Sequence, residues 1–377
     1  MKTITASANQ PLKGTFEILT NQDGYYAHAT STAEADKRVV LNCGNGEALD
    51  GTAAKTFYIA LPQGEYTGLK FTLSDGTYTY PIEISGNKTL TAGIMYGKEV
   101  AGVEFVAPVP EGALKGKFSV SATKQVYFSN GNLQYHPKNN KWRFAESQED
   151  VCDKTVSASV HNAVGYSQNS DTWIDLFGWG TSNYDHNGSG CHPWNTSNAY
   201  KDYYPYGTTW GNDLNSSTGM ADWGKANATD LGEGWYTLSY SDWYYMLFTR
   251  KIKGATGVGK TFARAKIKDV KGQDLYGLVI FPDDYSGSQS SSLSSIPEGC
   301  AFLPCAGHRG KTNVNGYLTS GYYWTSTHHN SKENYAWNLA ISSNQDYVTE
   351  FRPNSISSGN KITQGQSVRL VHDVPAN

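Results

Sequence analysis

Short runs in which apolar and polar residues alternate dominate residues 1–107. Such runs, rich in β-branched and aromatic side chains, are typical of half-buried strands. Turn-forming segments separate them, and SDGT at 74–77 predicts the clearest hairpin. No apolar stripe of helical period is visible, so this part is predicted to be an antiparallel β-sandwich. The expected strands are 13–20, 37–44, 55–62, 67–74, 77–85 and 98–106.

The segment APVPEGALKG contains two prolines and two glycines between strand-like stretches, which predicts a linker over 108–116. We therefore expect two domains, 1–107 and 117–377, which agrees with a chain of 377 residues. The second domain is predicted to open with hairpins across SNGN (129–132) and KNN (138–140).

Residues 165–230 are rich in Trp, Tyr, Gly and Asn without regular periodicity, so we expect a packed but irregular region. The strongest helix pattern covers 238–253, where Ser239 or Ser241 is the expected N-cap. Its buried face repeats at helical spacing, and LYGLVIFP at 275–282 follows as a buried strand. The core positions of this helix are Trp243, Met246, Leu247 and Arg250.

Composition narrows the classes of function. Lys+Arg 31 against Asp+Glu 34 give a net charge of -3, which excludes a general nucleic-acid footprint or a polybasic membrane patch. No transmembrane run and no signal peptide are visible, which leaves a cytosolic protein or an exported one with its signal removed. The Tyr, Trp, Asn, Gly and Thr content favours export to an extracellular or outer-membrane surface. The odd count of five cysteines excludes full pairing within the chain. Residues five apart are often too distant to bridge, so buried thiols are favoured over a Cys300–Cys305 disulfide.

Six strings occur in the order VYFSNGNLQY, WIDLFGWGTSNY, GWYTLSYSDWYYMLFTR, FLPCAGHRG, GYYWTST and GQSVRLV. This series resembles a family of surface adhesins from Bacteroides-type gut bacteria. The resemblance spans roughly 117–371. It implies an α+β C-type-lectin-like domain, a fold shared with formylglycine-generating enzymes.

PLKGTFEI, VVLNCGNGEAL and FYIALPQGEYTGLKFTLSDGTYTYP are similar to fimbrillin domains. That resemblance implies a transthyretin-like β-sandwich that associates with other pilus subunits. Only MKTITASAN precedes the PLxG turn, where the family usually has a strand, so a truncated domain is an open alternative.

The string from GYYWTST to SVRLV also resembles the variable region of retroelement-diversified proteins. This resemblance implies that surface side chains of a rigid scaffold bind the ligand. The positions that fit, and our candidate ligand-binding residues, are Tyr322, His328, His329, Asn330, Tyr335, Asn344, Asp346 and Tyr347.

Catalytic and metal motifs are weak. A formylglycine-type oxidase needs a reactive cysteine pair near the C-terminal end of the fold, whereas the last cysteine here is Cys305. A hydrolase nucleophile motif, G-x-S-x-G between a strand and a helix, is also not found. Asp185, Asn187 and Ser189 begin a calcium-loop pattern, but its closing position is Thr196 instead of an acid, so no cofactor is predicted. A zinc site of His308, His328 and His329 is weaker than their interpretation as exposed loop histidines.

Segments 183–212 and 321–348 are rich in Tyr, Trp, Ser, Gly and Asn, the residue types that are enriched in antibody paratopes. Six tryptophans in the family-like strings are expected in the core instead: Trp173, Trp179, Trp235, Trp243, Trp324 and Trp337. Arg369 is expected to be structural and to pair with a buried carboxylate.

We therefore predict a non-enzymatic cell-surface adhesin, associated with a pilus, that binds a host or microbial glycan or protein. A diversified receptor of similar fold and an enzyme with an unrecognised site are the alternatives.

Overall fold

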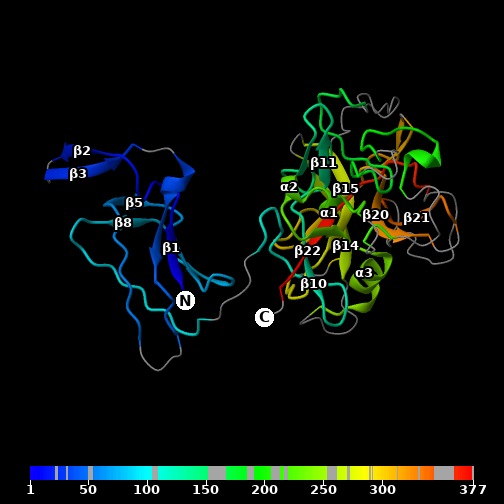
Figure 1. Ribbon diagram of the computed structural model, residues 1–377. Helices are drawn as coiled ribbons and strands as arrows, with labels where there is room; N and C mark the ends of the chain where they lie inside the picture. The colour runs from blue at the N-terminus through cyan, green and yellow to red at the C-terminus, as the bar shows by residue number, and fades with distance from the viewer. Residues whose placement is uncertain are drawn as a thin grey trace. The chain divides into compact units, whose positions relative to one another are not determined.

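The computed structural model divides into two compact units. Unit 1 covers Met1–Pro108 with the last residues from Pro375, and unit 2 covers Val109–Val374. The structure describes residues 1–21, 24–30, 33–49, 54–103, 109–151, 167–184, 191–204, 213–215, 220–252, 261–269, 272–287, 290, 292–311, 313–329, 332–343 and 361–375. Both units consist mostly of antiparallel strands with few, short helices (Figure 1).

Unit 1 is built on a four-stranded sheet in the order β4-β1-β6-β7, with a separate hairpin, β2-β3, and a separate two-stranded sheet, β5-β8, whose strands come before and after β6-β7 in the sequence. The 3-10 helix η1 (Glu34–Lys37) leads into β4. The strands are β1 (Thr3–Ser7), β2 (Phe16–Asn21), β3 (Gly24–Ala29), β4 (Arg38–Asn42), β5 (Gly64–Tyr66), β6 (Lys70–Ser74), β7 (Thr79–Glu83) and β8 (Lys88–Leu90).

The hairpin predicted at SDGT is confirmed, because β6 pairs antiparallel with β7 from Lys70↔Glu83 to Ser74↔Thr79. Asp75 accepts hydrogen bonds from the amides of Thr77 and Tyr78, the side-chain turn that this sequence predicts.

Two strand predictions in unit 1 are wrong, and four strands were not predicted: β1, β3, β5 and β8. Residues 55–62 and 98–103 form no strand, although Ile59 and Leu61 pack on the small core of the unit. Alternation fixes which side chains face inward, but a strand also needs a neighbouring backbone to pair with. The segment before the PLxG turn contains β1, which lies between β4 and β6 in the sheet.

The described part of unit 2 forms five sheets, in the orders β13-β22-β10-β9, β11-β12, β16-β14-β15-β17, β18-β19 and β20-β21. All of its named ladders are antiparallel except β14-β16. The strands are β9 (Phe118–Ser119), β10 (Gln125–Phe128), β11 (Leu133–His136), β12 (Lys141–Phe144), β13 (Trp235–Thr237), β14 (Phe262–Lys268), β15 (Asp274–Ile280), β16 (Ser292–Leu293), β17 (Ala301–Pro304), β18 (His308–Gly310), β19 (Asn313–Asn315), β20 (Ser320–His328), β21 (Ala336–Ser342) and β22 (Leu370–Asp373).

The last strand of unit 2, β22, pairs with two strands that come much earlier in the sequence. β22 pairs with β10 through Val126↔Asp373 and with β13 through Trp235↔His372. The hairpin predicted across KNN is confirmed as β11-β12, whereas the one across SNGN is wrong. Strand β10 pairs with β9 and β22, because the distant β22 occupies the edge that a local hairpin would have used.

Strand β15 is buried on both faces along most of its length. Leu278 and Ile280 of β15 face one core cluster, and Leu275 and Val279 face another, as the alternation of a strand requires. The buried strand predicted at 275–282 is therefore confirmed. The first of these clusters also contains Trp243 from the helical segment that covers this face.

The predicted helix is present but shorter, and it changes geometry. It consists of α3 (Tyr240–Tyr244) and the π-helical turn η3 (Tyr245–Thr249). Ser239 is the N-cap, and it forms a reciprocal capping box with Asp242. The four predicted core positions are buried, and the amide of Arg250 donates to the carbonyl of Tyr245, five residues back.

The irregular region is packed as predicted, where the structure describes it. Its short helices are η2 (Tyr200–Asp202), α1 (Trp223–Ala226) and α2 (Ala228–Leu231). Trp179, Tyr203 and Trp223 from this region are nearly inaccessible and join one core cluster with Trp324.

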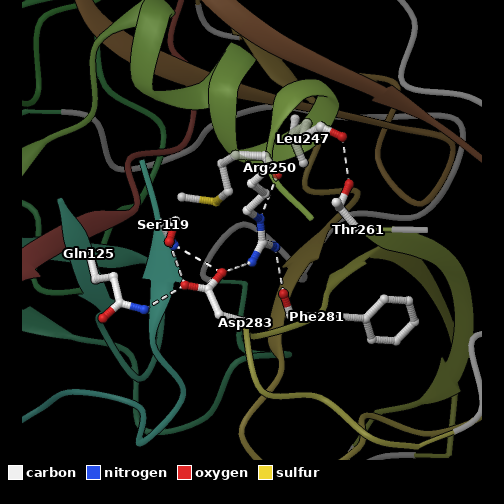
Figure 2. A network of polar contacts seen from close by, with 8 residues as sticks. Ser119, Gln125, Leu247, Arg250, Thr261, Phe281 and Asp283 are labelled. Atoms are coloured by element: carbon white, nitrogen blue, oxygen red, sulfur yellow. Dashed lines mark hydrogen bonds and ion pairs between the residues drawn. The ribbon is translucent and has the colours of Figure 1, made fainter. Parts of the chain in front are cut away.

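A buried ion pair fixes the end of η3 against the sheets (Figure 2). The Arg250 guanidinium donates to the Asp283 carboxylate and to the carbonyls of Met246 and Phe281. The other carboxylate oxygen accepts hydrogen bonds from Ser119 and Gln125, each at 2.6 Å. Burial raises the pKa of Asp283, but these hydrogen bonds and the charge of Arg250 outweigh burial and hold the pKa below its ordinary value.

Replacing Asp283 with Asn is expected to lower the free energy of unfolding by about 3–5 kcal/mol, because Arg250 would stay buried without a counter-charge. The control Glu146→Gln removes the exposed partner of Arg143 and should cost at most about 1 kcal/mol. Denaturant unfolding measures both.

The pKa of Asp283 is lower in the folded than in the unfolded protein, where it is about 3.9. Ionised Asp283 therefore stabilises the fold above about pH 3.9, and this contribution is lost as the pH falls through the folded pKa. The difference in free energy of unfolding between wild type and Asp283→Asn should thus become smaller below about pH 4. Equal stability of the two proteins at neutral pH would contradict the structural role of this pair.

Candidate functional site

Four of the eight candidate ligand-binding residues lie in the described part of the chain: Tyr322, His328, His329 and Tyr335. Asn330, Asn344, Asp346 and Tyr347 lie outside the described residues, as do Asp185, Asn187 and Ser189 of the calcium-loop pattern. The four described residues do not form one exposed cluster.

His328 is buried, which corrects its interpretation as an exposed loop histidine. It is the last residue of β20 and 4% exposed. Its amide donates to the carboxylate of Asp213 at 2.8 Å, and its Nε2 lies 2.8 Å from the carbonyl oxygen of Glu333. Strand β20 extends further than the motif indicated, and this carries His328 into the interior.

His329 is also buried, at 1% exposure. Its ring stacks on Trp337 with 4.7 Å between centroids and 18° between planes, and its amide donates to the carbonyl of Tyr335. Burial lowers the pKa of His329, and the nearby charges of Lys332 and His328 lower it further. The imidazole is therefore neutral at pH 7.

Tyr322 lies apart from these two histidines. It pairs with Ala340 across the β20-β21 ladder and meets the ring of His308 edge-on at 4.9 Å. Directly paired residues point to the same face, and successive residues alternate, so Tyr322 and Trp337 lie on opposite faces of this ladder.

Seven rings instead form a continuous aromatic face on unit 2. It runs in the order Tyr335, His329, Trp337, Tyr240, Tyr244, Phe248 and Phe262. Successive centroid distances are 6.4, 4.7, 5.0, 6.2, 5.5 and 6.0 Å, within the usual range for interacting rings. We call this set the aromatic face.

The middle of the aromatic face is open to solvent. Tyr244 is 44% exposed and Phe248 is 46% exposed, whereas Tyr240, Trp337 and Phe262 beside them are half-buried. The rings of the middle therefore offer a contact surface, and the buried His329 supports one end.

The position of α3 follows from contacts at its first turn. The amide of Tyr240 donates to the hydroxyl of Thr327 on β20, and the Tyr240 ring packs on Trp337 of β21. The helix therefore lies against the β20-β21 ladder, and Figure 1 shows the three elements close together.

Tyr244 and Phe248 were not among the predicted binding residues, although the helical pattern indicated that both side chains are exposed. Both fall on the side of the helix opposite to Trp243, Met246 and Leu247, where a surface helix normally has polar residues. Neighbouring large aromatic rings on the exposed side of a helix are typical of an interaction surface.

The other aromatic segment, 183–212, belongs mainly to the core where the structure describes it. Tyr203 and Tyr204 are each 1% exposed, and Trp194 and Tyr200 pack against the same cluster. Burial raises the pKa of Tyr203 to about 12. The buried Arg309 holds this segment by donating to the carbonyl of Asn195 at 2.9 Å.

The expected core tryptophans are confirmed for Trp179, Trp235, Trp243 and Trp324, while Trp173 and Trp337 are half-buried. Arg369 is buried as expected. Its guanidinium donates to the carbonyls of Ser129 and Phe302 instead of pairing with the expected carboxylate. Burial lowers the pKa of Arg369 to about 10.

Cys191, Cys300 and Cys305 are buried, so their interpretation as buried hydrophobes is confirmed, and Cys300 and Cys305 form no disulfide with each other. Burial raises the pKa of both Cys300 and Cys305 to about 12, which keeps them protonated and unreactive at neutral pH. Among the described residues, no group of three or more His, Cys, Asp or Glu side chains is arranged to hold a metal ion.

No helix within the described ranges is long and apolar enough to cross a membrane. Comparison of the chain with protein-family models, with curated proteins and with solved structures found no match. The function is therefore inferred from the geometry of the molecule.

If Tyr244 and Phe248 are surface rings, the double variant Tyr244→Ser/Phe248→Ser should lose at most about 1–2 kcal/mol of stability. Trp324→Ala, which empties a 1% exposed site, should lose about 3–5 kcal/mol. Urea unfolding measures the free energy of unfolding of both variants. If the double variant lost as much stability as Trp324→Ala, Tyr244 and Phe248 would belong to the core.

The lowered pKa of His329 predicts a dependence of stability on pH. Its folded pKa lies below the unfolded value of about 6.5, so the neutral ring stabilises above that value, and stability falls as the pH decreases below it. In His329→Gln, the free energy of unfolding should change less between neutral pH and about pH 5. An identical pH dependence of the variant and the wild type would show that His329 is not the responsible group.

Proposed function

We propose that this protein is a non-enzymatic, exported surface adhesin whose second unit binds its ligand through the aromatic face. In this proposal unit 2 has a C-type-lectin-like fold and unit 1 a transthyretin-like, fimbrillin-type fold. The observation that supports it most is the row of rings centred on the exposed Tyr244 and Phe248. Tyrosine and phenylalanine present large, rigid contact areas and lose little conformational entropy on binding.

The burial of other candidate groups supports binding over catalysis. Cys300 and Cys305 stay protonated, which argues against a formylglycine-type oxidase. The burial of His328 and His329 favours the adhesin over a retroelement-diversified receptor, because diversified positions have to reach the surface to contact a ligand.

A role in a pilus is the second part of the proposal, and exposed apolar residues of unit 1 support it. Met95 is 82% exposed and Tyr58 is 71% exposed, although isolated surface hydrophobes would need no explanation. They are part of a larger set: Ile18, Val40, Leu49, Tyr58, Ile94, Met95, Tyr96 and Val100. In this proposal a neighbouring subunit covers part of this set.

The full chain should bind at least one probe in a combined array of surface glycans and extracellular proteins. Tyr244→Ser/Phe248→Ser should weaken that binding about tenfold or more, the range expected for aromatic groups at the centre of an interface. Met220→Ser is the matched control, because it removes a 53% exposed apolar side chain of unit 2 that lies in neither proposed binding surface, and it should leave the binding unchanged.

Binding that survives the double variant with unchanged affinity would place the site elsewhere on the molecule. Circular dichroism on each variant checks that the fold is retained, so that a loss of binding can be assigned to the missing rings.

A further inference from the structure

Strand β4 forms an open edge of the four-stranded sheet in unit 1. It pairs with β1 from Thr3↔Asn42 to Ser7↔Arg38, and within the described part of the unit no strand pairs with its other side. An unpaired edge presents backbone N–H and C=O groups on which a further strand can form. Strand β4 therefore has the geometry of a docking site for another extended segment.

The hydrogen bonds between β4 and β1 show which backbone groups of β4 face outward. The amide of Cys43, directly after β4, donates to the carbonyl of Lys2, directly before β1. Residues that bond to the neighbouring strand alternate along an antiparallel ladder, so the N–H and C=O groups of Arg38, Val40 and Asn42 point away from β1. Among the described residues, no backbone group forms a hydrogen bond with these outward groups.

The opposite edge of the same sheet, β7, is protected against a further strand. The amide of Ile84 donates to the carbonyl of Leu69 in the ladder with β6, so by the same alternation Pro81 lies at an outward-facing position. Proline has no N–H, and at an edge it prevents another strand from pairing. Strand β4 contains neither proline nor glycine, and its central side chain, Val40, is 54% exposed. Of the two edges, β4 is therefore the one that can accept a strand.

A second copy of β4 fits this edge in the antiparallel orientation. When Val40 of one copy lies opposite Val40 of the other, Arg38 lies opposite Asn42, and the outward groups of both copies meet as hydrogen-bonded pairs. The central pair is apolar, and each guanidinium faces a neutral carboxamide, so no like charges oppose each other. A contact made by the same surface of both copies is the commonest geometry of homodimers.

We propose that two copies of this chain associate through β4, which joins their four-stranded sheets into one antiparallel sheet across a two-fold axis at Val40. This inference depends neither on the aromatic face nor on a role in a pilus, although Val40 belongs to the exposed apolar set of unit 1. The pairing uses backbone hydrogen bonds and few side chains, so the interface is small. We therefore expect a weak dimer, with a Kd in the micromolar to millimolar range.

Sedimentation equilibrium of the full chain over a range of concentrations measures this association. The wild type should shift from a monomer of 41.3 kDa toward a dimer as the concentration rises. Val40→Pro removes an N–H that points away from β1, so unit 1 keeps its own ladder while the dimer loses its central hydrogen bonds. The dimer of this variant should be about tenfold or more weaker than that of the wild type.

Charged variants test the two-fold register, because only in this register does position 40 lie opposite itself. Val40→Lys and Val40→Glu should each associate about tenfold or more weakly, since each places like charges at the centre of the contact. An equimolar mixture of the two variants should form dimers again, because lysine then faces glutamate, and added salt should weaken these mixed dimers. Met220→Lys is the matched control, because it changes a 53% exposed apolar side chain of unit 2 and should leave the association unchanged.

A chain that stays monomeric up to millimolar concentration would overturn the inference, and so would an association that no Val40 variant weakens. If both charged variants lost the dimer and their mixture did not restore it, β4 would contact a different segment, and the two-fold pairing would be wrong. Circular dichroism checks that each variant is folded. Each Val40 variant should still bind the probes of the array through the aromatic face, so failure of this inference would leave the proposed function unaffected.

Discussion

The carboxylate of Asp283 joins segments of unit 2 that are far apart in the sequence. It accepts hydrogen bonds from Ser119 at the end of β9 and from Gln125 at the start of β10, and it pairs with Arg250 at the end of η3. The same guanidinium holds the Met246 carbonyl within the helical turn. A charge that is 1% exposed needs such partners, so the position of η3 follows from this pair. Tyr244 and Phe248 lie on the outer side of the segment that the pair fixes.

Aromatic residues with similar local sequences have different environments in this protein. Tyr203 and Tyr204 in the irregular segment are buried, and so are Tyr323 and Trp324 on β20. Tyr244 and Phe248, in a segment with a clear helical pattern, reach solvent. A region with little regular structure has few backbone ladders, and it uses its large side chains to fill the interior.

The sequence by itself determined the local features. The β6-β7 and β11-β12 hairpins, the capped start of the helix at Ser239 and the buried strand β15 depend on residues adjacent in the chain, so turn chemistry and periodicity were sufficient to predict them. The tertiary structure alone decided which strands pair over long distances. It placed β22 beside β10, and it left 55–62 without a neighbouring strand in the described part of unit 1. It also decided the site, because burial depends on what packs above a side chain. His328 and His329 carry the same local signal as exposed loop residues, and only the extension of β20 and the stacking on Trp337 put them inside.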